Sequence, residues 1–249
     1  MTEFYVGYLP KAPTGIAKRI KTLIAIALVL GAVAAITFAR VQMTFAPSTF
    51  EYGKEQTFEG VIETRPFPAL VTTGSGGTDT EAKRYLLVAT GKHGADSQVL
   101  PYAGQTVRLR GTLIHRGNQS MIELVKDSVA VRGDMRQGPD PMTDLGTFNL
   151  TGEIVDSKCY LGVMNPGNGK VHRDCAVRCL SGGIPPIFAT NDFRGTPAIL
   201  VLADFAGKPL PKQAILNLVA QPVRVHGRVL QSDGTLFLET EQTGILPLP

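Results

Sequence analysis

The sequence predicts a mainly β protein in which one apolar N-terminal helix precedes two small β-barrels in tandem. Three observations lead to this prediction: an uncharged apolar run near the N-terminus, two stretches of short alternating strands that resemble each other, and a segment rich in cysteine and histidine that interrupts the second stretch. With 249 residues, the chain is long enough for two domains that each bury their own core.

The apolar run covers residues 22–39 and contains no charged side chain. As a helix, such a run covers about 27 Å, which is enough to cross the hydrocarbon core of a bilayer. The basic residues before it are Lys11, Lys18, Arg19 and Lys21, whereas only Arg40 follows directly. The positive-inside rule therefore predicts a membrane anchor, with residues 1–21 in the cytoplasm and the C-terminal domains on the other side of the membrane.

A cleaved signal peptide is the alternative interpretation of the same run. Residues 32–34 and 37–39 are both small-residue sequences of the kind that signal peptidase cleaves. However, the segment before the run would be unusually long for a leader, and it contains the aromatic sequence FYVGYLP. A retained anchor is therefore favoured, and we expect FYVGYLP to pack on a membrane-protein partner, either in the cytoplasm or at the membrane interface.

The basic character of the chain belongs to its N-terminal end. The sequence has 25 Lys and Arg and 21 Asp and Glu, and its first forty residues hold five of the former and one of the latter. Residues 41–249 are therefore neutral. A neutral domain lacks the basic surface that nucleic-acid binding requires, so no nucleic-acid partner is predicted.

Two stretches of the chain form an internal repeat. Residues 105–128 read QTVRLRGTLIHRGNQSMIELVKDS, and residues 221–244 read QPVRVHGRVLQSDGTLFLETEQTG. Each predicts a hairpin of alternating strands around a Gly-containing turn. The match continues upstream, where 58–67 parallels 150–159 and 84–92 parallels 198–208. We expect one helix, at 212–219 in the second half.

Five short strands in this order predict a small Greek-key barrel of the OB type in each half, with a β-sandwich as the alternative. The expected boundaries are 50–135 for the first OB-like domain, 136–146 for a linker rich in Gly, Pro and Asp, and 147–247 for the second. Between the first two strands, we expect a plain loop at 68–83 in the first half and the insertion 156–183 in the second. Loops at this position of an OB fold commonly bind ligands.

The insertion reads DSKCYLGVMNPGNGKVHRDCAVRCLSGG and contains every cysteine of the chain. If the part after Gly169 is helical, His172, Cys175 and Cys179 lie on one face, and Cys159 can fold back as a fourth ligand. Three thiolates and an imidazole suit zinc or copper. Additional candidate ligands are Met164 and His226, and the candidates for orienting His172 are Asp156 and Asp174. The candidates for lowering the thiol pKa values are Lys170, Arg173 and Arg178.

A disulfide is the alternative interpretation of the three cysteines. In an oxidising compartment, Cys159 paired with Cys175 or Cys179 would staple the insertion, with a stabilisation of about 3 kcal/mol, and would leave one thiol over. A thiol redox enzyme is a third hypothesis, and it requires one cysteine of low pKa.

No catalytic residue is predicted, and we do not expect an independent enzyme. The sequence contains no G-x-S-x-G, P-loop, dinucleotide fingerprint or H-E-x-x-H motif.

The segment DSKCYLGVMNPGNGKVHRDCAVRCLSGGIPP, together with FYVGYLPKAP near the N-terminus, resembles a family of membrane-anchored bacterial envelope proteins whose activity is not established. The layout of one anchor followed by an OB-fold domain resembles the haem chaperone of cytochrome c maturation, whose haem-binding His motif this sequence lacks. The Cys-x3-Cys spacing is similar to that of the binuclear copper centre of respiratory oxidases, whose downstream His and Met are missing here. The first resemblance implies a bacterial source, which would place the anchor in the inner membrane and the C-terminal domains in the periplasm. None of the three resemblances assigns a residue a role.

The expected function is a metal-binding electron-transfer or assembly component of a membrane oxidoreductase. The alternative is a non-enzymatic scaffold or docking protein that binds no metal and carries a disulfide-stapled loop.

Overall fold

A computed structural model describes residues 12–42, 48–72, 82–135 and 141–249. The sequence FYVGYLP, residues 73–81 of the expected loop 68–83 and residues 136–140 of the expected linker lie outside the described residues. The chain divides into two compact units, Met1–Phe45 and Ala46–Pro249, and both barrels belong to the second.

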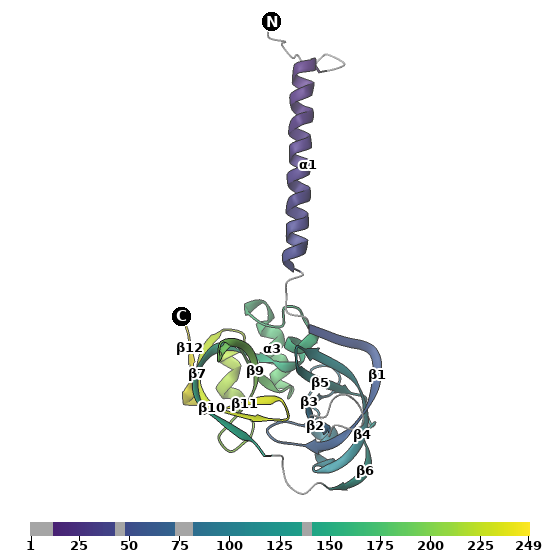
Figure 1. Cartoon of the computed structure of the whole chain (residues 1–249), viewed down its shortest axis with the longest axis vertical. Helices are drawn as coiled ribbons and strands as arrows, with labels where there is room; N and C mark the ends of the chain where they lie inside the picture. Colours follow the sequence, from purple (N-terminus) through teal and green to yellow (C-terminus); the bar gives the residue numbers. More distant parts are fainter. Residues whose placement is uncertain (1–11, 43–47, 73–81, 136–140) are drawn as a thin grey trace. The chain divides into compact units, whose positions relative to one another are not determined.

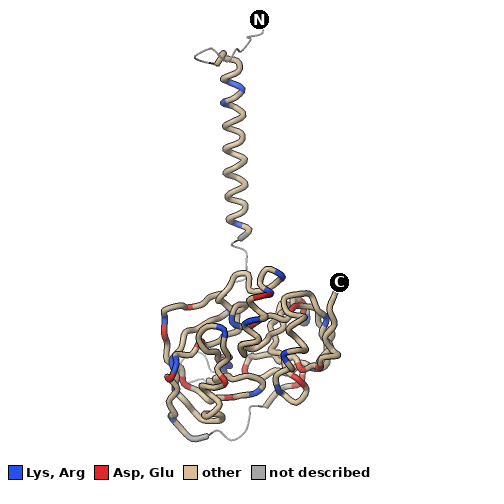
Figure 2. Tube along the Cα trace, turned by 180° about the vertical axis from the view of Figure 1, so that it is seen from behind, with Lys and Arg blue, Asp and Glu red and all other residues tan. Residues whose placement is uncertain are grey.

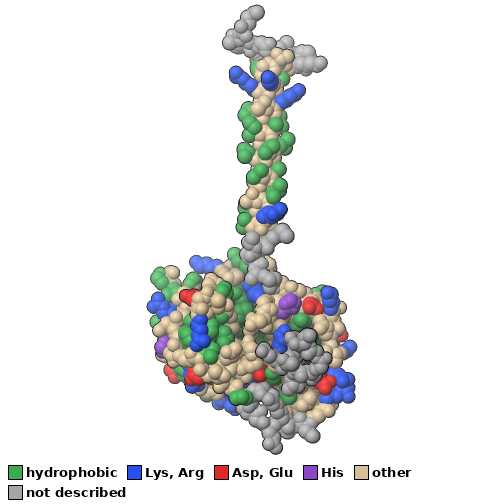
Figure 3. Space-filling view, in the orientation of Figure 1, with side chains coloured by type: hydrophobic (Ala, Val, Ile, Leu, Met, Phe, Trp, Pro, Cys, Tyr) green, Lys and Arg blue, Asp and Glu red, His purple; other side chains and the backbone are tan. Residues whose placement is uncertain are grey.

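The first unit contains the helix α1 (Thr14–Gln42). Within the described residues, α1 is the only helix long and apolar enough to cross a membrane, and none of its apolar stretch is buried. Lys and Arg gather at its N-terminal end, at Lys18, Arg19 and Lys21, and Arg40 lies in its last turn (Figure 2). Hydrophobic side chains cover the helix between these basic ends (Figure 3). The helix thus has the features of a membrane anchor, and it extends beyond the apolar run at both ends.

The first barrel is built from β1 (Ser48–Glu63), β2 (Ala69–Thr72), β3 (Lys83–Val88), β4 (Gln105–Arg116), β5 (Gln119–Leu124) and β6 (Ala130–Met135). The strands follow the order β1-β2-β3-β5-β4, and pairing of β1 with β4 closes the barrel. The β3–β5 pair is parallel and the other pairs are antiparallel. This five-stranded closed Greek-key arrangement is that of an OB fold, and β6 extends it beside β4.

The second barrel repeats this topology with β7 (Thr143–Asp156), β8 (Pro186–Phe193), β9 (Thr196–Ala203), β10 (Pro222–Ser232), β11 (Thr235–Glu239) and β12 (Ile245–Pro247). Pairing of β7 with β10 closes it, and the β9–β11 pair is again the parallel one (Figure 1). The predicted fold class, two tandem OB-like barrels after an apolar helix, is therefore confirmed. The second barrel already begins at Thr143, inside the segment expected as linker.

Two details differ from the expected elements. The short strand β2 lies within the stretch 68–83 that we expected to be a loop, so the insertion of the second barrel corresponds to the tight connection 64–68 of the first. The first barrel also has its own short helix, α2 (Asp96–Val99) with a 3-10 turn η1 (Leu100–Tyr102). It corresponds to α4 (Lys212–Ile215) and η4 (Leu216–Leu218), where a helix was expected. Helices and strands this short leave too few residues for a clear periodicity.

Matching glycines let both barrels close. A Cβ on Gly111 of β4 would overlap Ile122 of β5, and a Cβ on Gly227 of β10 would overlap the carbonyl of Glu239 of β11. Only glycine permits this close approach of neighbouring strands at a bend. The repeated Gly seen in the sequence therefore has the same steric origin in both halves.

Three apolar clusters form the core of the second unit. One lies within each barrel, and the third joins the barrels. The joining cluster includes Leu86 and Met121 of the first barrel and Val201 and Phe237 of the second, together with Cys159 and Cys179. Two of the three cysteines thus belong to the interface between the barrels, and the third, Cys175, packs against it.

A buried ion cluster accompanies this apolar interface. Arg84 of β3 pairs with Glu63 of β1 at 2.6 Å and with Asp233, in the β10–β11 turn, at 3.0 Å. The Arg84 side chain is 2% exposed, so its charge depends on these two carboxylates. The barrels are therefore joined by polar as well as apolar contacts.

Candidate metal centre

The insertion between β7 and β8 consists of short helical segments, and a hydrogen bond joins its two ends. A π-helical turn, η2 (Cys159–Val163), is followed by a loop, a 3-10 turn η3 (Lys170–His172) and the helix α3 (Arg173–Ser181). At the base, the N–H of Ser157 donates to the carbonyl of Pro185 at 3.1 Å. The loop is fixed where the N–H of Gly169 donates to Glu153 Oε2 at 2.9 Å. The predicted helix after Gly169 is confirmed.

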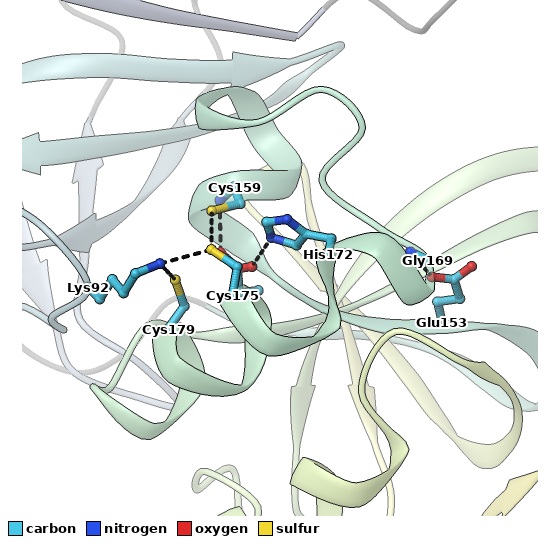
Figure 4. A network of polar contacts seen from close by, with 8 residues as sticks. Lys92, Glu153, Cys159, Gly169, His172, Cys175 and Cys179 are labelled. Atoms are coloured by element: carbon cyan, nitrogen blue, oxygen red, sulfur yellow. Dashed lines mark hydrogen bonds and ion pairs between the residues drawn. The ribbon is translucent and has the colours of Figure 1, made fainter.

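The structure brings the four predicted ligands into two overlapping groups. The donor atoms of Cys159, His172 and Cys175 all lie within 4.8 Å of one another, and so do those of Asp156, Cys159 and Cys179. Cys159 belongs to both groups. Figure 4 shows Cys179 on one side of the Cys159–Cys175 pair and His172 on the other. Cys159, His172 and Cys179 are buried, and Cys175 is partly exposed.

The three cysteines are free thiols. Cys159 Sγ lies 4.0 Å from Cys175 Sγ. In a tetrahedral zinc–thiolate site with bonds of 2.3 Å, two sulfur atoms are about 3.8 Å apart. The Cys159–Cys175 pair therefore already has the spacing of two ligands to one cation.

Asp156 holds both Cys159 and His172. Its Oδ1 accepts the backbone N–H of Cys159 at 2.8 Å, and its Oδ2 lies 3.0 Å from Nε2 of His172. The Asp156 side chain is completely buried, and that of His172 is 3% exposed. A histidine that donates one ring N–H to a carboxylate presents its other nitrogen as a metal ligand, so Nδ1 of His172 is the atom available for a cation.

A lysine from the first barrel completes the site. Lys92, in the connection between β3 and α2, donates from Nζ to Cys175 Sγ at 2.8 Å and to Cys179 Sγ at 3.6 Å (Figure 4). The contact with Cys175 is the main cause that raises the pKa of Lys92. The ammonium group and the two sulfur atoms therefore stabilise each other's charged forms.

The backbone around Lys92 is fixed by the insertion itself. Lys158, which directly precedes Cys159, donates to the carbonyls of Ala89 at 2.9 Å and Gly91 at 2.6 Å, and it pairs with Glu123 of β5. On the other side of Lys92, the N–H of Gly94 donates to the carbonyl of Gly182 at 3.0 Å.

Gly182 follows α3 and lies against the Lys92 backbone. A Cβ at position 182 would overlap the Lys92 carbonyl. Because Gly182 has no Cβ, the backbone of the first barrel can approach the end of α3 closely.

The surroundings of Cys159 and Cys179 shift the pKa values of the two thiols in opposite directions. The hydrogen bond from the Cys159 thiol, assisted by the charge of Lys92, lowers the pKa of Cys179 to about 7. The same hydrogen bond, followed by burial and the nearby Asp156 carboxylate, raises the pKa of Cys159. Cys179 is therefore the more acidic thiol of the pair.

The other residues considered from the sequence do not join this centre. Met164 is 45% exposed at the end of η2. His226 is exposed on β10, where its Nδ1 lies 2.9 Å from Asn149 Oδ1. Asp174 is exposed in the first turn of α3, so Asp156 alone of the two carboxylates contacts His172.

The basic group at the thiols is not one of those expected. Lys170 and Arg173 line a separate surface pocket of about 270 Å³ with Asp174, and Arg178 is exposed on α3. The cation that contacts the sulfur atoms is Lys92. The only sequence signal for Lys92 is its place in the repeat, where Lys208 is its counterpart; nothing in that pattern points to a thiol.

Comparison of the chain with protein-family models, with curated proteins and with solved structures finds no match. The assignment of a function therefore depends on the chemistry of the site.

Proposed function

We propose that this chain is a membrane-anchored metal-binding protein whose double barrel holds one thiophilic cation, Zn²⁺ or Cu⁺, through Cys159, His172, Cys175 and Cys179. The observation that carries the proposal is the gathering of the Cys159, His172 and Cys175 donor atoms within 4.8 Å of one another. Cys179 reaches the same centre through its proximity to Cys159. Binding of one cation by all four residues requires side-chain rotation, because Cys179 lies outside the group formed by Cys159, His172 and Cys175.

The ligand set is better suited to a site that stores a metal ion than to one that transfers electrons. Three thiolates and one imidazole form a closed set for four-coordinate d¹⁰ cations, whereas electron-transfer copper sites use two histidines, one cysteine and a weak axial ligand. Of the two roles expected in a membrane oxidoreductase, electron transfer and assembly, we therefore favour assembly. The protein would hold a metal for, or help to mature, a partner enzyme in the membrane.

The anchor supports a membrane partner and an extracytoplasmic location. Basic residues are concentrated at the N-terminal end of α1, which favours an N-terminus in the cytoplasm and barrels in the periplasm of a bacterium. This agrees with the resemblance of the cysteine segment and FYVGYLPKAP to bacterial envelope proteins.

Elemental analysis of the full chain, purified in detergent under reducing conditions, tests the proposal. We expect about one zinc or copper per chain, and its loss in Cys159→Ser, because Cys159 belongs to both donor groups. Met164→Leu is the matched control, since it removes a sulfur of the same insertion whose side chain is 45% exposed. Absence of metal from the wild-type chain after reconstitution with either cation would overturn the proposal.

A disulfide-stapled scaffold is the second candidate, and the 4.0 Å separation of Cys159 Sγ and Cys175 Sγ favours it. A small side-chain movement would bring these atoms to the bonded distance of about 2.05 Å. Thiol counting before and after reduction separates the two functions. One free thiol without reductant and three with it, together with no bound metal, would support the scaffold.

A further inference from the structure

We propose that Lys92 is a specificity-determining residue of the metal centre, and that its positive charge favours Cu⁺ over Zn²⁺. This inference rests on the proposed metal-binding function. It adds that the first barrel, which contributes no metal ligand, takes part in choosing the cation.

The contacts of Lys92 place one positive charge against two ligands at once. Its Nζ lies 2.8 Å from Cys175 Sγ and 3.6 Å from Cys179 Sγ. Lys92 approaches from the side opposite His172, so it can remain in place when a cation binds among the four donors (Figure 4). Ammonium groups donate hydrogen bonds to metal-bound thiolates as they do to free ones.

The charge balance of metal binding differs between the two cations. Three thiols lose their protons when a metal binds, so the ligands contribute three negative charges. A centre with Zn²⁺ therefore carries a net charge of −1, and one with Cu⁺ carries −2. The ammonium group of Lys92 stabilises the more negative Cu⁺ centre more strongly, by the interaction of one additional unit charge.

No other charge described around the centre replaces the positive charge of Lys92. Asp156, completely buried beside His172, adds one further negative charge. Lys158 is paired with Glu123 and binds two carbonyls, so its charge is already compensated. Among the residues that the structure describes, Lys92 is the only cation that donates to these sulfur atoms.

The repeat supplies a matched control for Lys92. Lys208 follows Gly207 in the second barrel as Lys92 follows Gly91 in the first, and both glycines have left-handed φ angles, 67° and 73°. Both lysines are exposed, so neither substitution by methionine buries or uncovers a charge in the core. Only Lys92 contacts the thiols.

The test compares the affinities of the full chain for Cu⁺ and Zn²⁺ by competition with chelators under anaerobic, reducing conditions. In Lys92→Met, we expect weaker binding of both cations and a ratio of Cu⁺ to Zn²⁺ affinity about tenfold below that of the wild type, a moderate value because solvent screens an exposed ammonium group. Lys92→Arg keeps the charge and should keep the ratio. Lys208→Met should leave both affinities unchanged.

The outcomes distinguish this inference from the function it rests on. An unchanged affinity ratio in Lys92→Met, with both cations still bound, would overturn the role of Lys92 and leave the metal site intact. An equal fall in the ratio of Cu⁺ to Zn²⁺ affinity in Lys208→Met would also overturn it, because the removal of any one positive charge would then explain the effect. A wild-type chain that binds neither cation would overturn both proposals.

Discussion

The two barrels have the same strand pairing, but they differ most at the connection between their first two strands. In the first barrel, β1 and β2 are joined by the five residues 64–68, whereas in the second β7 and β8 are separated by residues 157–185, which contain nearly all of the insertion. The candidate ligands Cys159, His172, Cys175 and Cys179 all lie in that insertion. A closed barrel tolerates such an insertion because the strand pairs on both sides of it are unchanged.

The first barrel, which has no cysteine, also contributes to the cysteine cluster. It supplies Lys92 to the sulfur atoms, and it accepts Lys158 from the insertion. The apolar cluster that contains Cys159 and Cys179 includes residues from both barrels. The centre therefore lies at the interface between two similar barrels, and both barrels contribute side chains to it.

Breaking the buried ion cluster should have the largest effect on stability. Arg84→Met leaves Glu63 and Asp233 without their common cation, so we expect a loss of about 3–5 kcal/mol in the free energy of unfolding. Arg108→Met is the control, because its partner Glu59 and Arg108 itself are about half exposed and their pair contributes about 1 kcal/mol or less. Chemical denaturation of the detergent-solubilised chain measures both. Equal losses would show that Arg84 does not join the barrels.

Removing the buried carboxylate should weaken metal binding next. In Asp156→Asn, the amide cannot stabilise the tautomer of His172 as the carboxylate does, so we expect an affinity about 10–100-fold lower. Asp174→Asn, an exposed change close to His172 in sequence, should have no effect. Chelator competition gives the two affinities, and a similar loss in both variants would contradict the assignment of Asp156.

A side chain at Gly182 should separate the first barrel from the insertion. In Gly182→Ala, the new Cβ overlaps the Lys92 carbonyl, so we expect a loss of about 1–3 kcal/mol and a weaker contact of Lys92 with the thiols. Gly133→Ala in β6 is the control, since its Cβ would meet only ordinary contacts, the nearest at 3.5 Å. Thermal unfolding distinguishes the two. A harmless Gly182→Ala would mean that the Lys92 loop can move away at little cost.

The smallest expected effect is on thiol ionisation in the metal-free chain. Thiolate absorbance should show a step near pH 7 from Cys179, and this step should move to higher pH in Lys92→Met. Because the folded state lowers the pKa of Cys179 from 9.0, ionisation of this group stabilises the fold fully above about pH 9, and the contribution is lost as the pH falls through about 7. A first step close to pH 9 in the wild type would contradict this environment for Cys179.

Much of the fold and most of the ligand set can be predicted from the sequence. Alternating residues around Gly117 and Gly234 predict the two hairpins, and the repeat predicts that the barrels share one topology. The spacing of His172, Cys175 and Cys179 places them together because they lie within two turns of one helix. Short strands such as β2 escaped prediction, since four residues carry too little periodicity.

The sequence by itself determined the apolar helix, the double barrel and the place of the Cys/His cluster, because these depend on local hydrophobic patterns and on residues close together in the chain. Only the tertiary structure decided which charges meet the thiols. Lys92 and Cys175 are 83 residues apart, and Arg84 and Asp233 are 149 apart. Contacts of this kind depend on how the two barrels pack on each other, and an exposed lysine in a loop carries no local pattern that reveals its partner.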